Sequence, residues 1–142
     1  MQESSSDEIL REAVNKLKKS YKVHAIILFG SRARKDHKPW SDYDLLIIAD
    51  FKEKFLERIG KLLELLPSKV EPHPYTLSEA IEMLKRGNIT LVDALEEGVL
   101  LYSDEEFEIL RQIYKEMVEK GLRRSKVSII LPEFEETDSQ KI

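Results

Sequence analysis

The chain has 142 residues, of which 42% are hydrophobic and 35% charged, and its formal net charge is −4. This length and hydrophobic content exclude an intrinsically disordered protein and allow one buried core, so we expect a single soluble domain over 1–132. The net negative charge excludes nucleic-acid binding through overall positive charge. The lack of cysteine excludes disulfides and thiolate metal sites. No apolar run approaches the ~20 residues of a membrane-spanning helix.

Hydrophobic periodicity divides the first half of the chain into alternating helices and strands. Two short apolar runs rich in branched residues have the length of buried strands. A third extended stretch contains Pro72 and Pro74, which remove two backbone donors and place the stretch at a sheet edge. The predicted elements are a loose start at Met1–Ser6, a helix from Asp7 to Leu17, a strand Val23–Phe29, a short helix Ser31–Lys35, a loop His37–Ser41, a strand Tyr43–Ala49, a helix Lys52–Leu66 and a strand Lys69–Tyr75.

Capping and stop signals define the second half. Thr76 and Glu79 have the three-residue spacing of a capping box, Gly87 ends the helix that they open, and Asn88 caps the next one. The predicted elements are a helix from Thr76 through Leu84, a helix Thr90–Glu97, a short extended piece Val99–Tyr102, a helix Asp104–Lys120, a strand or extended arm Val127–Leu131 and a flexible polar tail Glu133–Ile142.

The order of these elements favours an α/β or α+β fold, in which helices pack against a small sheet. Two apolar helix faces are expected to pack on it. The face of the helix Lys52–Leu66 comprises Phe55, Ile59, Leu62, Leu63 and Leu66. The face of the helix Asp104–Lys120 comprises Phe107, Leu110, Ile113, Tyr114 and Met117 and is also a candidate surface for a partner or a dimer. The polar N-terminus is unlike a secretory signal, so we expect a cytoplasmic protein.

A first candidate site lies directly after the first predicted strand. Gly30 has no side chain, so a phosphate group can approach the backbone there. A helix that begins with Ser31 near its N-cap would direct backbone amides at that phosphate, and the Ser31 hydroxyl adds a donor. The stretch that follows is locally basic on an acidic chain. Its charged residues are Arg32, Arg34, Lys35 and Lys38 against Asp36.

A second candidate site opens the strand Tyr43–Ala49. Asp42 and Asp44 are two residues apart, so their side chains leave an extended chain on the same side. Neighbouring carboxylates repel each other unless a cation lies between them, and Mg²⁺ takes such carboxylates together with phosphate oxygens. Asp-x-Asp and Gly-Ser are each common by chance, but together they indicate a metal-assisted phosphate chemistry.

The run GSRARKDHKPWSDYDLLII resembles the signature of the DNA polymerase β-like nucleotidyltransferase superfamily. It is similar to the minimal nucleotidyltransferases, which include antitoxins paired with HEPN-domain toxins. The resemblance covers roughly Val23–Tyr102 and implies a mixed sheet flanked by helices, Mg²⁺ as cofactor, ATP as substrate and an adenylyltransferase-like enzyme. The residues that match the signature are Gly30, Ser31, Arg32, Ala33, Arg34, Pro39, Ser41, Asp42, Asp44 and Leu45.

The resemblance assigns roles to several of these residues. Asp42 and Asp44 are implied to bind the metal, and Arg32 or Arg34 to lie near the β- and γ-phosphates. The third carboxylate of the family is usually an aspartate on a following strand. Here the matching position is Glu71, which is implied to bind metal or to accept a proton from the acceptor hydroxyl. A second departure is Lys35, where the family usually has glycine.

Three functions remain open from the sequence. The first is transfer of a nucleoside monophosphate to a hydroxyl of a protein or RNA acceptor, such as a HEPN-family toxin. The second is transfer to a small hydroxylated molecule, and the third is a non-catalytic antitoxin or binding module. Near the motif, Trp40 can stack on a base or pack on the sheet rim, and His73 can serve the site or the surface. His24, in the first strand, is expected to be structural.

Overall fold

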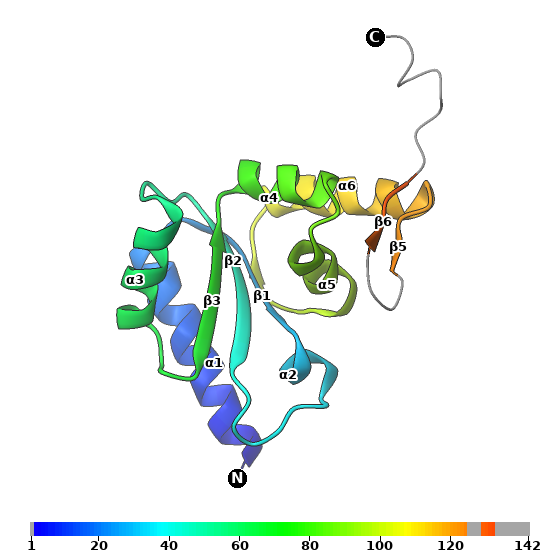
Figure 1. The fold of residues 1–142 in the computed structure, drawn as a ribbon. Coiled ribbons are helices and arrows are strands. Elements are labelled where there is room, and N and C mark those ends of the chain that lie inside the picture. Colours follow the sequence, from blue (N-terminus) through cyan, green and yellow to red (C-terminus); the bar gives the residue numbers. More distant parts are fainter. Residues whose placement is uncertain (1, 125–128, 133–142) are drawn as a thin grey trace.

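A four-stranded sheet with the strand order β3-β2-β1-β4 forms the centre of the fold (Figure 1). The computed structural model describes residues 2–124 and 129–132. β1 (Val23–Phe29) pairs antiparallel with β2 (Tyr43–Ala49) and with β4 (Val99–Ser103), whereas β3 (Val70–Tyr75) pairs parallel with β2. The sheet is therefore mixed, and the strand that contains the two prolines lies at its edge as predicted.

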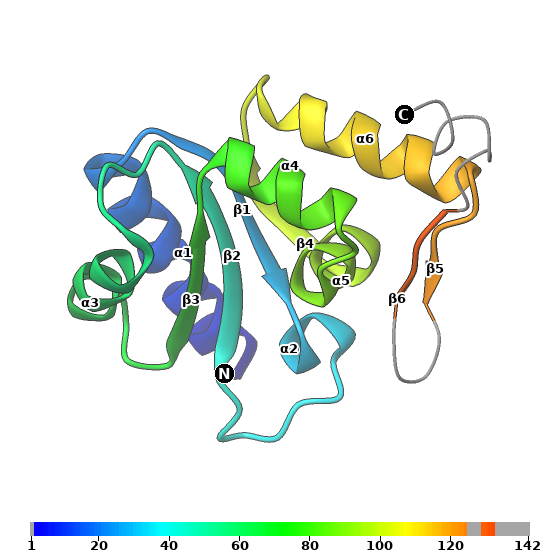
Figure 2. The same ribbon diagram turned by 45° about the horizontal axis from the view of Figure 1, so that its top comes forward.

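Helices cover both faces of the sheet (Figures 1 and 2). α1 (Gln2–Ser20) and α3 (Phe55–Leu65) lie on one face. The other face is covered by α4 (Leu77–Lys85), α5 (Ile89–Glu97) and α6 (Phe107–Glu119). The three remaining elements are the single turn α2 (Ser31–Arg34) and the two strands of a small ribbon, β5 (Arg123–Arg124) and β6 (Ile129–Ile130). None of the described helices has the length and apolar character needed to cross a bilayer.

The two faces of the sheet bury different residues of the same strands. Along β2, Leu45 and Ile47 pack in the core under α1 and α3, whereas Leu46 and Ile48 pack in the core under the other helices. This alternation follows from the two-residue repeat of a strand. It also explains why β1 is apolar apart from His24 and β2 is apolar after Asp44, since a strand that is covered on both faces has no polar side.

Several predicted boundaries shift. α1 already begins at Gln2, so the expected loose start is helical from that residue. α6 begins at Phe107 because the Asp104 carboxylate accepts hydrogen bonds from the amides of Glu106 and Phe107, which places Asp104 before the helix. The capping box of Thr76 and the Asn88 cap are both present as predicted. The expected tail Glu133–Ile142 and the start of the expected arm at Val127 lie outside the described residues.

The predicted apolar face of α3 is wrong in part. Phe55 and Leu63 are exposed, and the helix buries Arg58 beside Leu62 instead. The Arg58 side chain reaches across β3 to α4, where it donates to both carboxylate oxygens of Glu79 at 2.7 and 3.1 Å. A guanidinium that is 5% exposed needs such a partner, because an unpaired charge in the interior is strongly destabilising.

Replacing Glu79 by Gln tests this ion pair. Glutamine keeps an acceptor for the capping box but leaves the Arg58 charge without a counter-ion, so we expect the free energy of unfolding in urea to fall by about 1–2 kcal/mol. Glu82→Gln, on the exposed side of the same helix, is the matched control and should cost less than about 0.5 kcal/mol.

The same pair predicts a pH dependence. Hydrogen bonds from Arg58, opposed by partial burial, hold the pKa of Glu79 below its usual value. Its contribution to stability is therefore complete above the carboxyl pKa of the unfolded chain and is lost as the pH falls through the lower pKa of the folded state. The stability difference between the wild type and Glu79→Gln should shrink on acidification; a constant difference would contradict the assignment.

Candidate functional site

Three strand ends meet at the candidate site. In the sheet register, Phe29 of β1 lies opposite Asp44 of β2, and Asp44 lies beside Glu71 of β3. Gly30 follows β1 directly, so it lies at the same end of the sheet. The structure therefore brings together three of the predicted residues, Gly30, Asp44 and Glu71, from positions up to 41 residues apart in the sequence.

A histidine completes this group. The Nε2 atom of His73 lies 3.3 Å from Oδ1 of Asp44 and 3.7 Å from Oε2 of Glu71. One ligand atom from each of the three residues lies within 4.8 Å of the others, which is close enough to share a metal ion. His73 also packs its ring edge-on against Phe29 at a centroid distance of 4.9 Å. The sequence carried a signal for His73, because it stands two residues after Glu71 on the same side of the strand.

The two carboxylates have opposite protonation tendencies. Burial disfavours ionisation of Asp44, but hydrogen bonds with His73 and Glu71 outweigh burial and hold its pKa below the usual value. The hydrogen bond with Asp44 and partial burial raise the pKa of Glu71. Of the two carboxyl groups, Glu71 therefore binds a proton more readily than Asp44.

Asp42 lies at the margin of this group. It precedes β2 and is exposed, and it does not belong to the close set of ligand atoms in the described part of the chain. Its charge nevertheless contributes to the raised pKa of Glu71, so the two side chains interact electrostatically. The metal-binding role of Asp42 stays a prediction.

Gly30 allows Asp44 to lie against the backbone. A Cβ atom at Gly30 would lie 2.6 Å from Oδ2 of Asp44, a separation that real Cβ atoms do not tolerate. The backbone angles of Gly30, φ 75° and ψ −157°, also belong to a region that only glycine adopts readily. The sequence predicts that the lack of a side chain at Gly30 lets a phosphate approach the backbone. In the structure, it also makes room for the Asp44 carboxylate.

The turn after Gly30 differs from the prediction. Gly30, and not Ser31, is the N-cap of α2, and its cap has no side-chain hydrogen bond. Because α2 has only four residues, it lacks the aligned peptide dipoles of a full helix. The phosphate donors that the turn offers are therefore the amides of its first residues and the Ser31 hydroxyl.

The two arginines of the turn have different surroundings. Arg32 donates to the carbonyl oxygens of Pro39 and Ser41 and lies over the Tyr43 ring at 4.2 Å, so it holds the loop that leads to Asp42. Arg34 contacts Asp36 and Glu97, and its charge contributes to the lowered pKa of Asp44. Of the two arginines, Arg34 is therefore the one whose charge favours the ionised form of Asp44.

The family model of a nucleotidyltransferase domain matches residues 9–141, which is well over half of the chain. The chain belongs to the nucleotidyltransferase domain family. The predicted enzyme class, a nucleotidyltransferase, is therefore confirmed. Two relatives from Methanocaldococcus jannaschii are named as candidate protein adenylyltransferases. They are 42% and 41% identical to this nucleotidyltransferase over 73 residues, which are 48% of this chain and 72% of each relative.

Solved structures share the fold of this nucleotidyltransferase. A chain from a crystal structure of a toxin–antitoxin with AMP-PNP has a TM-score of 0.54 at 18% identity, over 78% of this chain and 86% of that chain. A chain from the toxin–antitoxin MntA–HepT has a TM-score of 0.51 at 17% identity, over 80% and 86%. These likenesses confirm the predicted fold, a small mixed sheet flanked by helices.

The departure at Lys35 has a conformational explanation. Lys35 ends α2 in the left-handed region, with φ 64° and ψ 27°, and its amide and that of Asp36 both bond to the Ser31 carbonyl. Among the described residues other than glycine, it alone has a positive φ. The position therefore suits the glycine that the resembled family usually has, and the lysine side chain carries a steric penalty there.

Lys35→Gly should raise the free energy of unfolding by about 0.5–1 kcal/mol, because glycine removes that penalty. Lys38→Gly in the adjacent loop removes the same charge without relieving a positive φ, so it should be neutral or slightly destabilising. Urea unfolding of both variants decides the point: equal effects at the two positions would show that the left-handed conformation carries no penalty.

Gly30→Ala should displace the Asp44 carboxylate and force a strained backbone. We expect a loss of about 1–3 kcal/mol of stability together with loss of nucleotidyl transfer. Gly60→Ala is the matched control, since a Cβ there meets nothing within 4 Å and Gly60 lies inside α3; it should stabilise by about 0.5–1 kcal/mol and leave transfer intact. Full transfer activity in a folded Gly30→Ala protein would refute the close fit.

Proposed function

We propose that this nucleotidyltransferase moves AMP from ATP to a hydroxyl group of a protein, with Mg²⁺ as cofactor. The observation that carries the proposal is the meeting of Asp44, Glu71 and His73 beside the bare backbone of Gly30. Two carboxylates that face each other at this distance form a ready site for a divalent ion, and the glycine turn next to them offers phosphate donors.

The donor set fits Mg²⁺. Asp44, Glu71 and Asp42 supply oxygen ligands, which Mg²⁺ prefers, and His73 holds Asp44 in place by a hydrogen bond. When bound, Mg²⁺ neutralises charge on the triphosphate and on the leaving pyrophosphate. The residues of this chain then position the reactants.

In the proposed reaction, the amides of the Gly30–Ser31 turn and the Ser31 hydroxyl bind the phosphates, with Arg34 close by. The acceptor oxygen attacks the α-phosphorus, the bond to the β-phosphate oxygen breaks, and pyrophosphate leaves. Glu71 either takes the proton of the acceptor hydroxyl or completes the metal site, in which case that proton passes to solvent water. Arg32 acts through the loop that it holds and not on the phosphates.

The two Methanocaldococcus jannaschii relatives support a protein acceptor, since both are named as candidate protein adenylyltransferases. The fold shared with toxin–antitoxin chains makes a HEPN-family toxin the first acceptor to test, in which case the chain would act as its antitoxin. RNA and small hydroxylated molecules are the competing acceptors. A non-catalytic antitoxin is the second candidate function, because Glu71 replaces the family's usual aspartate.

Label transfer from α-labelled ATP tests the proposal. Purified protein is incubated with Mg²⁺ and with lysate of the source organism, and labelled material is digested with protease or ribonuclease. We expect a protease-sensitive labelled band. Asp44→Asn and Asp42→Asn should each reduce labelling at least roughly a hundredfold, because they remove metal ligands.

Glu57→Gln, an exposed carboxylate on α3, is the control for the loss of one negative charge and should label normally. Wild-type labelling by Asp44→Asn would refute the assigned site. A ribonuclease-sensitive or small-molecule product would replace the protein acceptor with one of its competitors. Binding of ATP without any labelled product would favour the non-catalytic antitoxin.

A further inference from the structure

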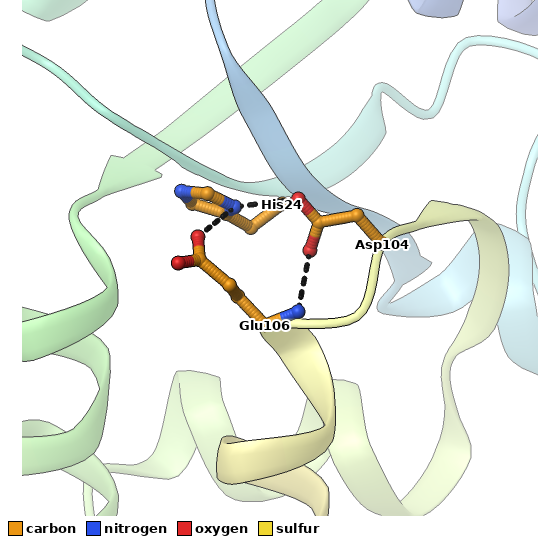
Figure 3. A group of neighbouring side chains, drawn as sticks. All are labelled: His24, Asp104 and Glu106. Atoms are coloured by element: carbon orange, nitrogen blue, oxygen red, sulfur yellow. Dashed lines mark hydrogen bonds and ion pairs between the residues drawn. The ribbon is translucent and has the colours of Figure 1, made fainter.

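A second cluster of potential metal ligands lies at the opposite end of β1 (Figure 3). His24 stands six residues before Gly30, which places it roughly 20 Å from the nucleotidyltransferase site at the ~3.3 Å rise of a strand residue. Its ring is 1% exposed. Nδ1 lies 2.7 Å from Oδ2 of Asp104 and 2.9 Å from Oε2 of Glu106, and Nε2 lies 2.8 Å from Oδ1 of Asp50.

The charges of this cluster do not balance. Three carboxylates surround one imidazole, and no lysine or arginine in the described part of the chain forms an ion pair with any of them. Even a fully protonated imidazole supplies only one positive charge. In addition, Nδ1 carries at most one proton, while two carboxylate oxygens converge on it. A second positive charge at this point would relieve both conflicts.

The ligands are already oriented. The Oδ1 atom of Asp104 accepts hydrogen bonds from the amides of Glu106 and Phe107, which leaves Oδ2 directed at the imidazole. The Asp104 amide donates to the His24 carbonyl, so the two residues are also joined through the backbone. A proton on Nε2 that is donated to Asp50 leaves the lone pair of Nδ1 facing Asp104 and Glu106.

We propose that His24, Asp104 and Glu106 bind a divalent transition-metal ion, with Zn²⁺ as the best fit. One imidazole nitrogen and two carboxylate oxygens are a ligand set for Zn²⁺, and the nitrogen disfavours Mg²⁺. The carboxylate of Asp50 on the other ring nitrogen is the outer partner that metal-bound histidines usually have.

A metal ion can reach the cluster from solvent and can fit between its ligand atoms. The Glu106 side chain is 54% exposed, so an ion can reach the cluster and a water can take the fourth position. Ligand atoms around tetrahedral Zn²⁺ lie about 3.3 Å apart, given metal–ligand distances of ~2.0–2.1 Å. The present distances from Nδ1 to Asp104 and Glu106 must therefore open by about 0.6 and 0.4 Å, which requires a small side-chain rotation of each carboxylate. A bound ion would join the start of α6 to β1.

Zn²⁺ binding is measured on the full chain with Asp44→Asn and Glu71→Gln, so that the nucleotidyltransferase carboxylates do not compete. Calorimetry should show one Zn²⁺ per chain, the Tm should rise with Zn²⁺ concentration, and Co²⁺ should give the visible absorption of a four-coordinate site. Mg²⁺ should have no comparable effect. In this background, Glu106→Gln should weaken Zn²⁺ binding at least about tenfold, and Asp50→Asn by about 10–100-fold.

Glu108→Gln, an exposed residue of the same helix, is the matched control and should leave the affinity unchanged. Asp104→Asn keeps the helix-capping oxygen while it removes the charge of the ligand oxygen, so it separates loss of the metal from loss of the fold. Failure of the parent protein to bind Zn²⁺, or an unchanged affinity in Glu106→Gln and Asp104→Asn, would overturn the proposal and leave His24 as a structural residue.

Discussion

The register of β2 against its two neighbours determines where the carboxylates of Asp44 and Glu71 lie in the nucleotidyltransferase site. Asp44 is on the face of β2 that also carries Leu46 and Ile48, and pairing with Phe29 and Glu71 places it between Gly30 and the edge strand. A slip of one residue would turn Asp44 to the other face and bury Leu45 and Ile47 in the wrong core. The two hydrophobic cores therefore specify the site geometry, because they make any other register costly.

The chain order of the elements and the α/β or α+β class could be predicted because they depend on local signals, whereas the mixed sheet is an expectation from the family resemblance of the Gly30-Ser31 and Asp42–Asp44 motif. Strands β1 and β2 are mostly apolar runs, and the caps at Thr76 and Asn88 are local hydrogen bonds. Other features depend on contacts between distant elements. The buried Arg58 looks like a surface residue of an amphipathic helix until Glu79 is placed beside it.

The candidate site shows the same division. Glu71 could be located because the resembled family has its third carboxylate on a following strand, but the inclusion of His73 required the neighbouring strand, since only then does Asp44 lie beside it. Arginine is a residue type that often binds phosphate, yet the guanidinium of Arg32 is directed at loop carbonyls and at Tyr43. Residue type and spacing identify the chemistry that is available, whereas the direction of a long side chain depends on the acceptors that folding brings within its reach.

Hydrogen bonds from three residues hold the backbone of the loop between α2 and β2. Arg32 holds the carbonyls of Pro39 and Ser41, Lys69 donates to the Pro39 carbonyl from the start of β3, and the Lys38 amide donates to the Ser41 hydroxyl. Between these anchors stands Trp40, whose side chain is 73% exposed and does not pack on the sheet rim. Much of the conformational entropy of this loop is thus lost on folding, so the exposed indole stands on a pre-organised backbone, and a planar group that stacked on it would not have to order the loop.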